Sequence, residues 1–268
     1  MRGYKAFFGI TGTPFSKSIP VAALYRYPQF EELSAYLDYV AEEGSLGLVT
    51  GETGVGKTTA LRSCLAGLDD KRHHVCYVGN ADASRSVFRQ LAWSFGMRAA
   101  HLRGDLRDDV HQRIGALWDE HRKRTFLVVD EAQLLGTKAL QELRLLTNHR
   151  CDSETPLGLV LAGQASLRAQ LKLPVNDALD QRIMLKYHLA GLSLPETKAY
   201  IAAHLAAVDA KHDVFTADAV ERIFQYTKGL PRRINKVCIQ ALIKAGHQEV
   251  KPITGDMILQ VLVHLDQE

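Results

Sequence analysis

The stretch SLGLVTGETGVGKTTALRSCLAGL, residues 45–68, decides the fold of this chain. It begins with a short apolar run, passes through the glycine-rich turn GETGVGKT at residues 51–58 and ends in a helix-forming segment. The turn matches the pattern GxxxxGK[ST] in full and stands in the strand–turn–helix setting that this pattern requires. Glycines let such a turn curl so that backbone N–H groups face phosphate oxygens, and the following helix adds its dipole. The stretch therefore predicts a phosphate-binding loop after a buried strand.

Four more apolar runs follow, separated by helix-forming segments. The runs are HHVCYVG at 73–79, TFLVVDE at 125–131, LGLVLAG at 157–163 and IMLKYHLA at 183–190. The last run alternates apolar and polar residues, which is typical of an edge strand. Helices are expected at 28–43, 84–96, 106–122, 137–149 and 164–172. This alternation predicts an α/β domain, in which helices cover both faces of a five-stranded parallel sheet.

The pattern changes after Leu192, where only helical segments follow. They span 193–208, 216–227, 231–246 and 254–265. Residues 1–27 mix glycine, proline and aromatic residues and indicate an irregular arm packed on another element. We therefore predict an arm and helix at 1–44 packed on the α/β core, an α/β domain at 45–191, and a helical domain at 192–268.

A second motif ends the third apolar run with the acidic pair Asp130 and Glu131. A buried parallel strand delivers such carboxylates to its carboxyl end, where nucleotides bind in α/β sheets. Lys57 would place its charge on the β- and γ-phosphates of ATP, while Thr58 and Asp130 would hold Mg²⁺. Glu131 would polarise the attacking water as a general base. A simple P-loop kinase transfers phosphate to an acceptor molecule and needs no glutamate that activates water. The adjacent Asp130–Glu131 pair therefore favours ATP hydrolysis.

Composition excludes several classes of protein. The chain has 268 residues, 46% of them hydrophobic and 24% charged, with a net charge of +3, so a polybasic nucleic-acid binder is not expected. No apolar run approaches the ~18–20 residues of a membrane helix, so we expect no membrane contact and a cytoplasmic protein. Its four cysteines form no CxxC pair and there is no HExxH motif, so we expect reduced thiols and no protein-built zinc site.

The ordered set of motifs resembles the AAA+ ATPase superfamily and, within it, the ExeA-like group, which is similar to the transposition ATPases TnsC and TniB. The residues that carry this resemblance are YKAFFGITGTPF, TGETGVGKTTALR, LVVDEAQLL, LQELRLLTN, LVLAGQASLRAQL, LDQRI and GLPRRINKVCIQAL. The resemblance implies a sheet of order 5-1-4-3-2 and a C-terminal helical lid.

The resemblance also implies roles for three further residues. Gln164 resembles the sensor-1 residue, which orients the attacking water. Arg182 resembles an arginine finger that reaches the γ-phosphate in a neighbouring subunit, which implies a homo-oligomer, either a ring or a helical filament. Arg232 resembles the sensor-2 arginine of the lid, with Arg233 as the competing candidate. The predicted nucleotide-binding residues are Gly51, Glu52, Thr53, Gly54, Val55, Gly56, Lys57, Thr58, Thr59, Asp130 and Arg232.

Double-stranded DNA is the partner that the resemblance implies. In a filament, each subunit needs only a few phosphate contacts, because repetition supplies the avidity. The candidates for these contacts are Arg98, His101, Arg103 and Lys138. Binding would be to the backbone and largely independent of sequence. The alternative is that the basic residues of 97–124 have no DNA-binding role, and that Arg122, Lys123 and Arg124 form an ordinary solvated helix end.

Three functions remain open at this stage. The favoured one is an ATPase that assembles with ATP on DNA and regulates transposition by recruiting or activating a transposase. The second is a secretion or envelope-assembly ATPase of the ExeA type. Longer proteins of that type carry a membrane helix and a peptidoglycan-binding region, and neither is seen before Glu268. The third is a replication-initiation or clamp-loading module.

Overall fold

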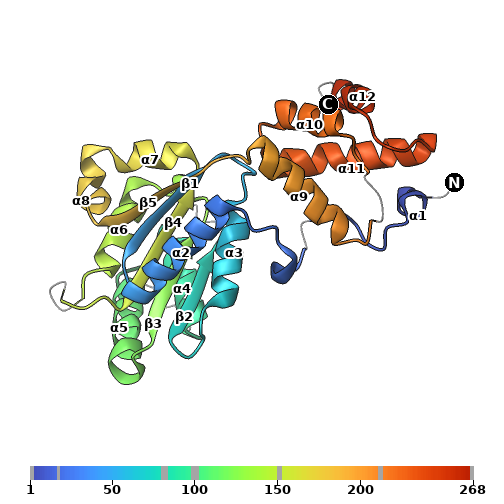
Figure 1. Cartoon of the computed structure of the whole chain (residues 1–268). Coiled ribbons are helices and arrows are strands. Elements are labelled where there is room, and N and C mark those ends of the chain that lie inside the picture. Colours follow the sequence, from blue (N-terminus) through green and yellow to red (C-terminus); the bar gives the residue numbers. More distant parts are fainter. Residues whose placement is uncertain are drawn as a thin grey trace. The chain divides into compact units, whose positions relative to one another are not determined.

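The computed structural model describes residues 3–16, 19–79, 84–97, 103–149, 153–210 and 214–265. The chain divides into two compact units, which are described separately (Figure 1). The first, here the sheet unit, comprises Pro28–Thr53 and Lys57–Leu189. The second, here the helical unit, comprises Met1–Tyr27, Gly54–Gly56 and Ala190–Glu268.

The sheet unit contains one parallel sheet of five strands. They are β1 (Leu46–Gly51), β2 (His73–Val78), β3 (Arg124–Val129), β4 (Leu157–Gly163) and β5 (Ile183–Leu189). Their order is β2-β3-β4-β1-β5, which confirms the order expected from the resemblance and places β5 at an edge. The central strands β1, β3 and β4 are buried almost throughout, as a sheet covered on both faces requires.

Helices connect these strands and cover the sheet. They are α2 (Pro28–Glu43), α3 (Lys57–Gly67), α4 (Ser84–Ser94), α5 (Arg103–His121), α6 (Thr137–Leu146), α7 (Ala165–Leu171) and α8 (Asp177–Asp180), with short 3-10 turns η2 (Ala132–Leu134) and η4 (Pro174–Asn176). The helix expected at 137–149 is shorter and ends at Leu146, where Thr147 is the C-cap and its hydroxyl donates to the carbonyl of Arg144 at 2.7 Å. The short elements α8 and η4 were not predicted.

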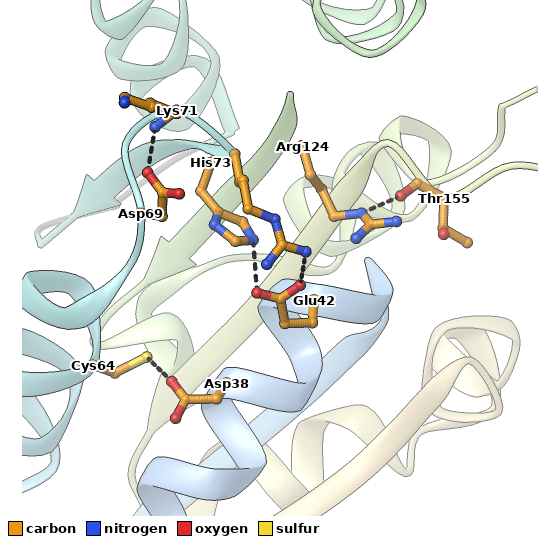
Figure 2. Close-up of polar contacts among 9 residues, drawn as sticks. Asp38, Glu42, Cys64, Asp69, Lys71, His73, Arg124 and Thr155 are labelled. Carbon is orange, nitrogen blue, oxygen red and sulfur yellow. Dashed lines mark hydrogen bonds and ion pairs between the residues drawn. The ribbon is translucent and has the colours of Figure 1, made fainter. Parts of the chain in front are cut away.

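Polar contacts join α2 to the amino-terminal ends of the strands (Figure 2). Glu42 accepts a hydrogen bond from Arg72 at 2.5 Å, and its second oxygen lies 3.8 Å from the buried His73 at the start of β2. Asp38 of the same helix accepts from the thiol of Cys64 at 3.6 Å, and burial raises the pKa of that thiol. The contact of Asp38 joins α2 to α3, and those of Glu42 lie at the amino-terminal end of β2, whereas the glycine-rich turn follows the carboxyl end of β1. They therefore anchor α2 and take no part in the site.

The helical unit is built from α9 (Leu194–Ala206), α10 (Ala217–Thr227), α11 (Pro231–Gln248) and α12 (Gly255–Leu265), together with α1 (Tyr4–Phe8) and the 3-10 turn η1 (Val21–Ala23). The N-terminal arm belongs to this unit, whereas the sequence led us to expect it on the α/β core. Contacts with α9 and the residues after it explain this grouping. Phe15 stacks on His204 with ring centroids 5.2 Å apart, and the backbone N–H of Thr11 donates to the carbonyl of Val208 at 3.0 Å. The arm is also partly helical.

Among the helices described, none is both long and apolar enough to cross a membrane.

Candidate nucleotide-binding site

The glycine-rich turn has the curled backbone that its sequence predicts. Gly54 and Gly56 have φ angles of +85° and +113°, a region that residues with side chains rarely adopt. Val55 between them is buried, and α3 begins at Lys57. The turn thus leads directly into a helix N-terminus, whose unpaired N–H groups favour an anion.

Lys57 is buried although it is charged, since its side chain turns back on the loop. Its ammonium donates to the carbonyls of Gly51 at 2.9 Å and Glu52 at 3.0 Å. Only 5% of the residue is exposed. A buried ammonium needs such partners, and the loop carbonyls supply them without neutralising its charge. The ammonium is therefore held beside the loop carbonyls of Gly51 and Glu52.

Thr58 and Asp130 meet although they are far apart in the chain. The Thr58 hydroxyl, in the first turn of α3, donates to Oδ2 of Asp130 at 2.7 Å. Asp130 directly follows β3 and is 2% exposed. A hydroxyl and a carboxylate are oxygen ligands of the kind that Mg²⁺ prefers. The residues present therefore fit the predicted metal ion.

Tyr77 is a further residue of this site that the sequence reasoning missed. It lies near the end of β2, and its hydroxyl donates to Oδ2 of Asp130 at 2.9 Å. Partial burial, followed by the bond to Asp130 and the nearby carboxylate charges, raises the pKa of Tyr77. The signal that could have found it is the strand order, because β2 lies beside β3 and the carboxyl ends of parallel strands share one edge.

Glu131 is held in a backbone conformation that is costly for a residue with a side chain. Its φ of 53° and ψ of 36° lie in the left-handed region, which costs about 1–2 kcal/mol. Its N–H donates to Oδ1 of Asp130 at 2.9 Å. Its carboxylate accepts from Nε2 of Gln133 at 2.6 Å. Such strain is often found at functional sites.

Gln164 follows β4, at the same carboxyl edge of the sheet. Its backbone N–H donates to Oε1 of Gln133 at 3.1 Å. Gln133 thus joins Gln164 to the carboxylate of Glu131. The sequence identified Glu131 and Gln164 but gave no sign of the glutamine between them.

Arg182 lies directly before β5, half-buried, and it contacts the end of α6. Its Nη1 donates to the Thr147 hydroxyl at 2.9 Å and also to the Asn148 amide oxygen. Within the single chain, this arginine is therefore bonded to the segment that directly follows α6.

Arg232 lies in the first turn of α11 and is exposed, as is the competing Arg233. Its backbone N–H donates to the carbonyl of Gly54 at 3.1 Å, a contact within the helical unit. A Cβ added at Gly54 would lie 2.7 Å from Cβ of Arg232, so this contact requires glycine. This contact involves the backbone and Cβ of Arg232, and the choice of Arg232 over Arg233 as the sensor-2 residue stays a prediction.

The proposed DNA contacts are only partly described. Arg98 and His101 lie outside the described residues, and Arg103 begins α5. Lys138 is exposed in the first turn of α6.

In the part of the chain that the structure describes, Asp119, His149 and Glu154 bring possible metal-ligand atoms within 4.8 Å of one another. Glu154 is also bonded by the indole of Trp118 at 2.9 Å.

Comparison with protein families gives a match over the sheet unit. Residues 40–171 match the family model described as an AAA domain. This chain carries an AAA domain. The match contains the glycine-rich turn, the Asp130–Glu131 pair and Gln164.

Two curated relatives confirm the resemblance that the motifs suggested. General secretion pathway protein A of Aeromonas hydrophila is 34% identical over 265 residues, covering 96% of this chain and 47% of that protein. The Mu-like prophage FluMu DNA transposition protein B of Haemophilus influenzae is 25% identical over 167 residues, covering 60% of this chain and 53% of that protein. The chain thus spans about half the length of either relative.

Solved structures show the same AAA+ fold. Cdc6p from Pyrobaculum aerophilum superposes with a TM-score of 0.69 at 17% identity, over 89% of this chain and 67% of that one. At this identity the likeness concerns the fold alone.

Proposed function

We propose that this protein is an Mg²⁺-dependent ATP hydrolase. The observation that carries the proposal is the meeting of Thr58 and Asp130 at 2.7 Å, directly beside Glu131. It brings two metal-holding oxygen groups and a carboxylate base to the carboxyl edge of the sheet, next to the phosphate loop. The AAA domain match supports the same activity.

Each residue has a defined task in this reaction. Lys57 and the loop N–H groups bind the β- and γ-phosphates. Thr58 and Asp130 would hold Mg²⁺, which neutralises charge on the phosphates when bound. Glu131 accepts a proton from water while the water oxygen bonds the γ-phosphorus. The bond from that phosphorus to the β,γ-bridging oxygen breaks, and ADP and phosphate leave.

Replacing Glu131 tests the assignment of the base. Glu131→Gln keeps the shape of the side chain but accepts no proton, so steady-state ATP hydrolysis should fall by about 10²–10⁴-fold. The Kd for a fluorescent ATP analogue should stay within about twofold of the wild-type value, because the base acts in the chemical step and not in nucleotide binding. Glu120→Gln, near the end of α5, is the control. Hydrolysis at the wild-type rate in Glu131→Gln would show that the base lies elsewhere.

We infer that ATP binding assembles several copies through Arg182, whose guanidinium would complete the site of a neighbour. Arg232 would face the nucleotide from the lid. Cytoplasmic location is part of this proposal, since the described cysteines Cys64, Cys76 and Cys238 are free and buried.

Two uses of this ATPase each have a specific observation behind them. Similarity to a DNA transposition protein supports assembly on double-stranded DNA and recruitment of a transposase. The longer match, at higher identity, to a general secretion pathway protein supports a role in secretion. Because that match covers 47% of the secretion protein, it supports a common ATPase module more directly than a common task.

Electron microscopy of the protein with a slowly hydrolysed ATP analogue separates the two uses. The sample is imaged with and without ~60-bp duplex DNA of arbitrary sequence, which is ~200 Å long and holds several subunits. Rings or filaments that need both nucleotide and DNA support the transposition role. Assemblies that form with nucleotide alone and ignore DNA support the secretion role.

A further inference from the structure

Gln133 bridges two groups that the proposed hydrolysis depends on. The side chain lies in η2, between β3 and α6, and is half-buried. Its Nε2 donates to Oε2 of Glu131 at 2.6 Å, and its Oε1 accepts from the backbone N–H of Gln164 at 3.1 Å. A carboxamide presents one donor face and one acceptor face at a fixed separation, so this bridge needs an amide.

Gly163, the last residue of β4, leaves the space that this bridge occupies. A Cβ at position 163 would lie 2.5 Å from Oε1 of Gln133, closer than real Cβ contacts allow. It would also lie 3.4 Å from the backbone nitrogen of Gln133 and 3.0 Å from Cδ2 of Leu167. The amide of Gln133 would therefore have to turn away from the end of β4 and lose its contact with Gln164. The bridge made by Gln133 therefore requires glycine at position 163.

Glu131 is consequently held at both ends. Asp130 accepts its backbone N–H at 2.9 Å, and Gln133 holds one carboxylate oxygen. The hydrogen bond from Gln133 to Oε2 restricts rotation of the Glu131 carboxylate. Orientation of this kind matters because small misplacements of a catalytic group cost large factors in rate.

We propose that Gln133 is a positioning residue for ATP hydrolysis, which aims the carboxylate of Glu131 and ties it to the end of β4. The inference rests on the proposed function, because it assumes that Glu131 is the base. Gln133 acts through Glu131 and Gln164 and binds no nucleotide itself. Its loss should therefore lower kcat and leave the binding of ATP unchanged.

Three single variants and one double variant test this in the full-length protein. Gln133→Ala removes the bridge, and Gln133→Met keeps the length of the side chain but removes the donor to Glu131 and the acceptor for Gln164. Gly163→Ala displaces the amide from the other side. Each should lower kcat by about 10–100-fold, with KM for ATP and fluorescent-analogue binding within about twofold of wild type. The double variant Gln133→Ala/Gly163→Ala should be no slower than Gln133→Ala alone, because both changes break one interaction.

A purely structural role for Gln133 gives different results. Packing alone would leave Gln133→Met active, since methionine fills nearly the same space as glutamine without adding a charge. The losses from Gln133→Ala and Gly163→Ala would then multiply in the double variant. Either result overturns the proposal. Gln133→Met also guards against misfolding of the alanine variants, and circular dichroism on every variant checks the fold.

The control Glu131→Gln separates this inference from the proposed function. If Glu131→Gln is inactive while both Gln133 variants hydrolyse ATP at the wild-type kcat, only the role of Gln133 is wrong. If Glu131→Gln is as active as wild type, the base assignment fails and the role of Gln133 fails with it.

Discussion

Asp130 shows how one buried carboxylate organises the candidate metal site. The hydroxyls of Thr58 and Tyr77 donate to Oδ2 at 2.7 and 2.9 Å, and the N–H of Glu131 donates to Oδ1 at 2.9 Å. Asp130 is 2% exposed, so water does not readily replace a donor that is lost. The orientation of this carboxylate therefore depends on these donors.

Removing the Tyr77 hydroxyl should weaken the response of the enzyme to Mg²⁺. In Tyr77→Phe, Asp130 loses a donor worth about 1 kcal/mol, so the Mg²⁺ concentration for half-maximal ATP hydrolysis should rise about fivefold. The measurement is an Mg²⁺ titration at saturating ATP. Tyr39→Phe, on the exposed side of α2, is the matched control. An unchanged half-saturating concentration would show that Thr58 and Glu131 suffice to orient Asp130.

At the scale of an element, α9 carries a buried histidine within an aromatic stack. His204 lies between Phe15 of the arm, at 5.2 Å, and Tyr200 of the same helix, at 4.3 Å between ring centroids. It is 5% exposed, and burial lowers the pKa of His204 to about 4. The neutral imidazole therefore packs as an aromatic ring, and a proton on it would oppose folding.

The stability of the protein should consequently fall with acid. The pKa of histidine in an unfolded chain is near 6.5, and that of His204 in the folded protein is about 4. The contribution of His204 to the free energy of unfolding is therefore complete above pH 6.5 and is lost as the pH falls from 6.5 to 4. The loss at pH 5 should be about 2 kcal/mol. Urea unfolding followed by circular dichroism at pH 7 and pH 5 measures it. His204→Leu should remove this part of the pH dependence, whereas the exposed His247→Leu should keep it. Equal dependence in both variants would assign the effect to other groups.

At the scale of the whole molecule, the proposed role of Arg182 is to couple ATP hydrolysis to assembly of several copies. In the single chain its guanidinium is held by Thr147 and Asn148 at the end of α6. These are neutral partners, so its charge is not cancelled by them. An arginine that completes a neighbour's site must leave or extend beyond such contacts.

Mixing two inactive variants tests sharing of the site between subunits. Lys57→Ala lacks a working phosphate site but keeps Arg182, and Arg182→Ala has the reverse defect. Each alone should hydrolyse almost no ATP, and a 1:1 mixture should regain about a quarter of the wild-type rate by random assembly. Thr147→Val, which removes a partner of Arg182 but keeps the arginine, should remain active. If the mixture hydrolyses no more ATP than the two variants alone, Arg182 does not complete the site of a neighbouring subunit.

Local patterns in the sequence were enough to predict the strands, the phosphate loop and the pair Asp130–Glu131. These features are local, because hydrophobic period, glycine spacing and the helix after the loop lie within short stretches of chain. The resemblance of the ordered motifs supplied the strand order, which local patterns alone do not encode. Each of these expectations has its counterpart in the fold.

The side chains that contact those residues could be identified only in the folded chain. Tyr77 reaches Asp130 across 53 positions of sequence, and Gln133 reaches Gln164 across 31. Neither has a local signal, since a tyrosine in a strand or a glutamine in a turn is ordinary in composition. The end of α6 and the grouping of the arm with the helical unit were likewise settled by contacts with distant segments. Packing chooses partners among residues that the sheet brings to a common edge, and this choice depends on the assembled fold.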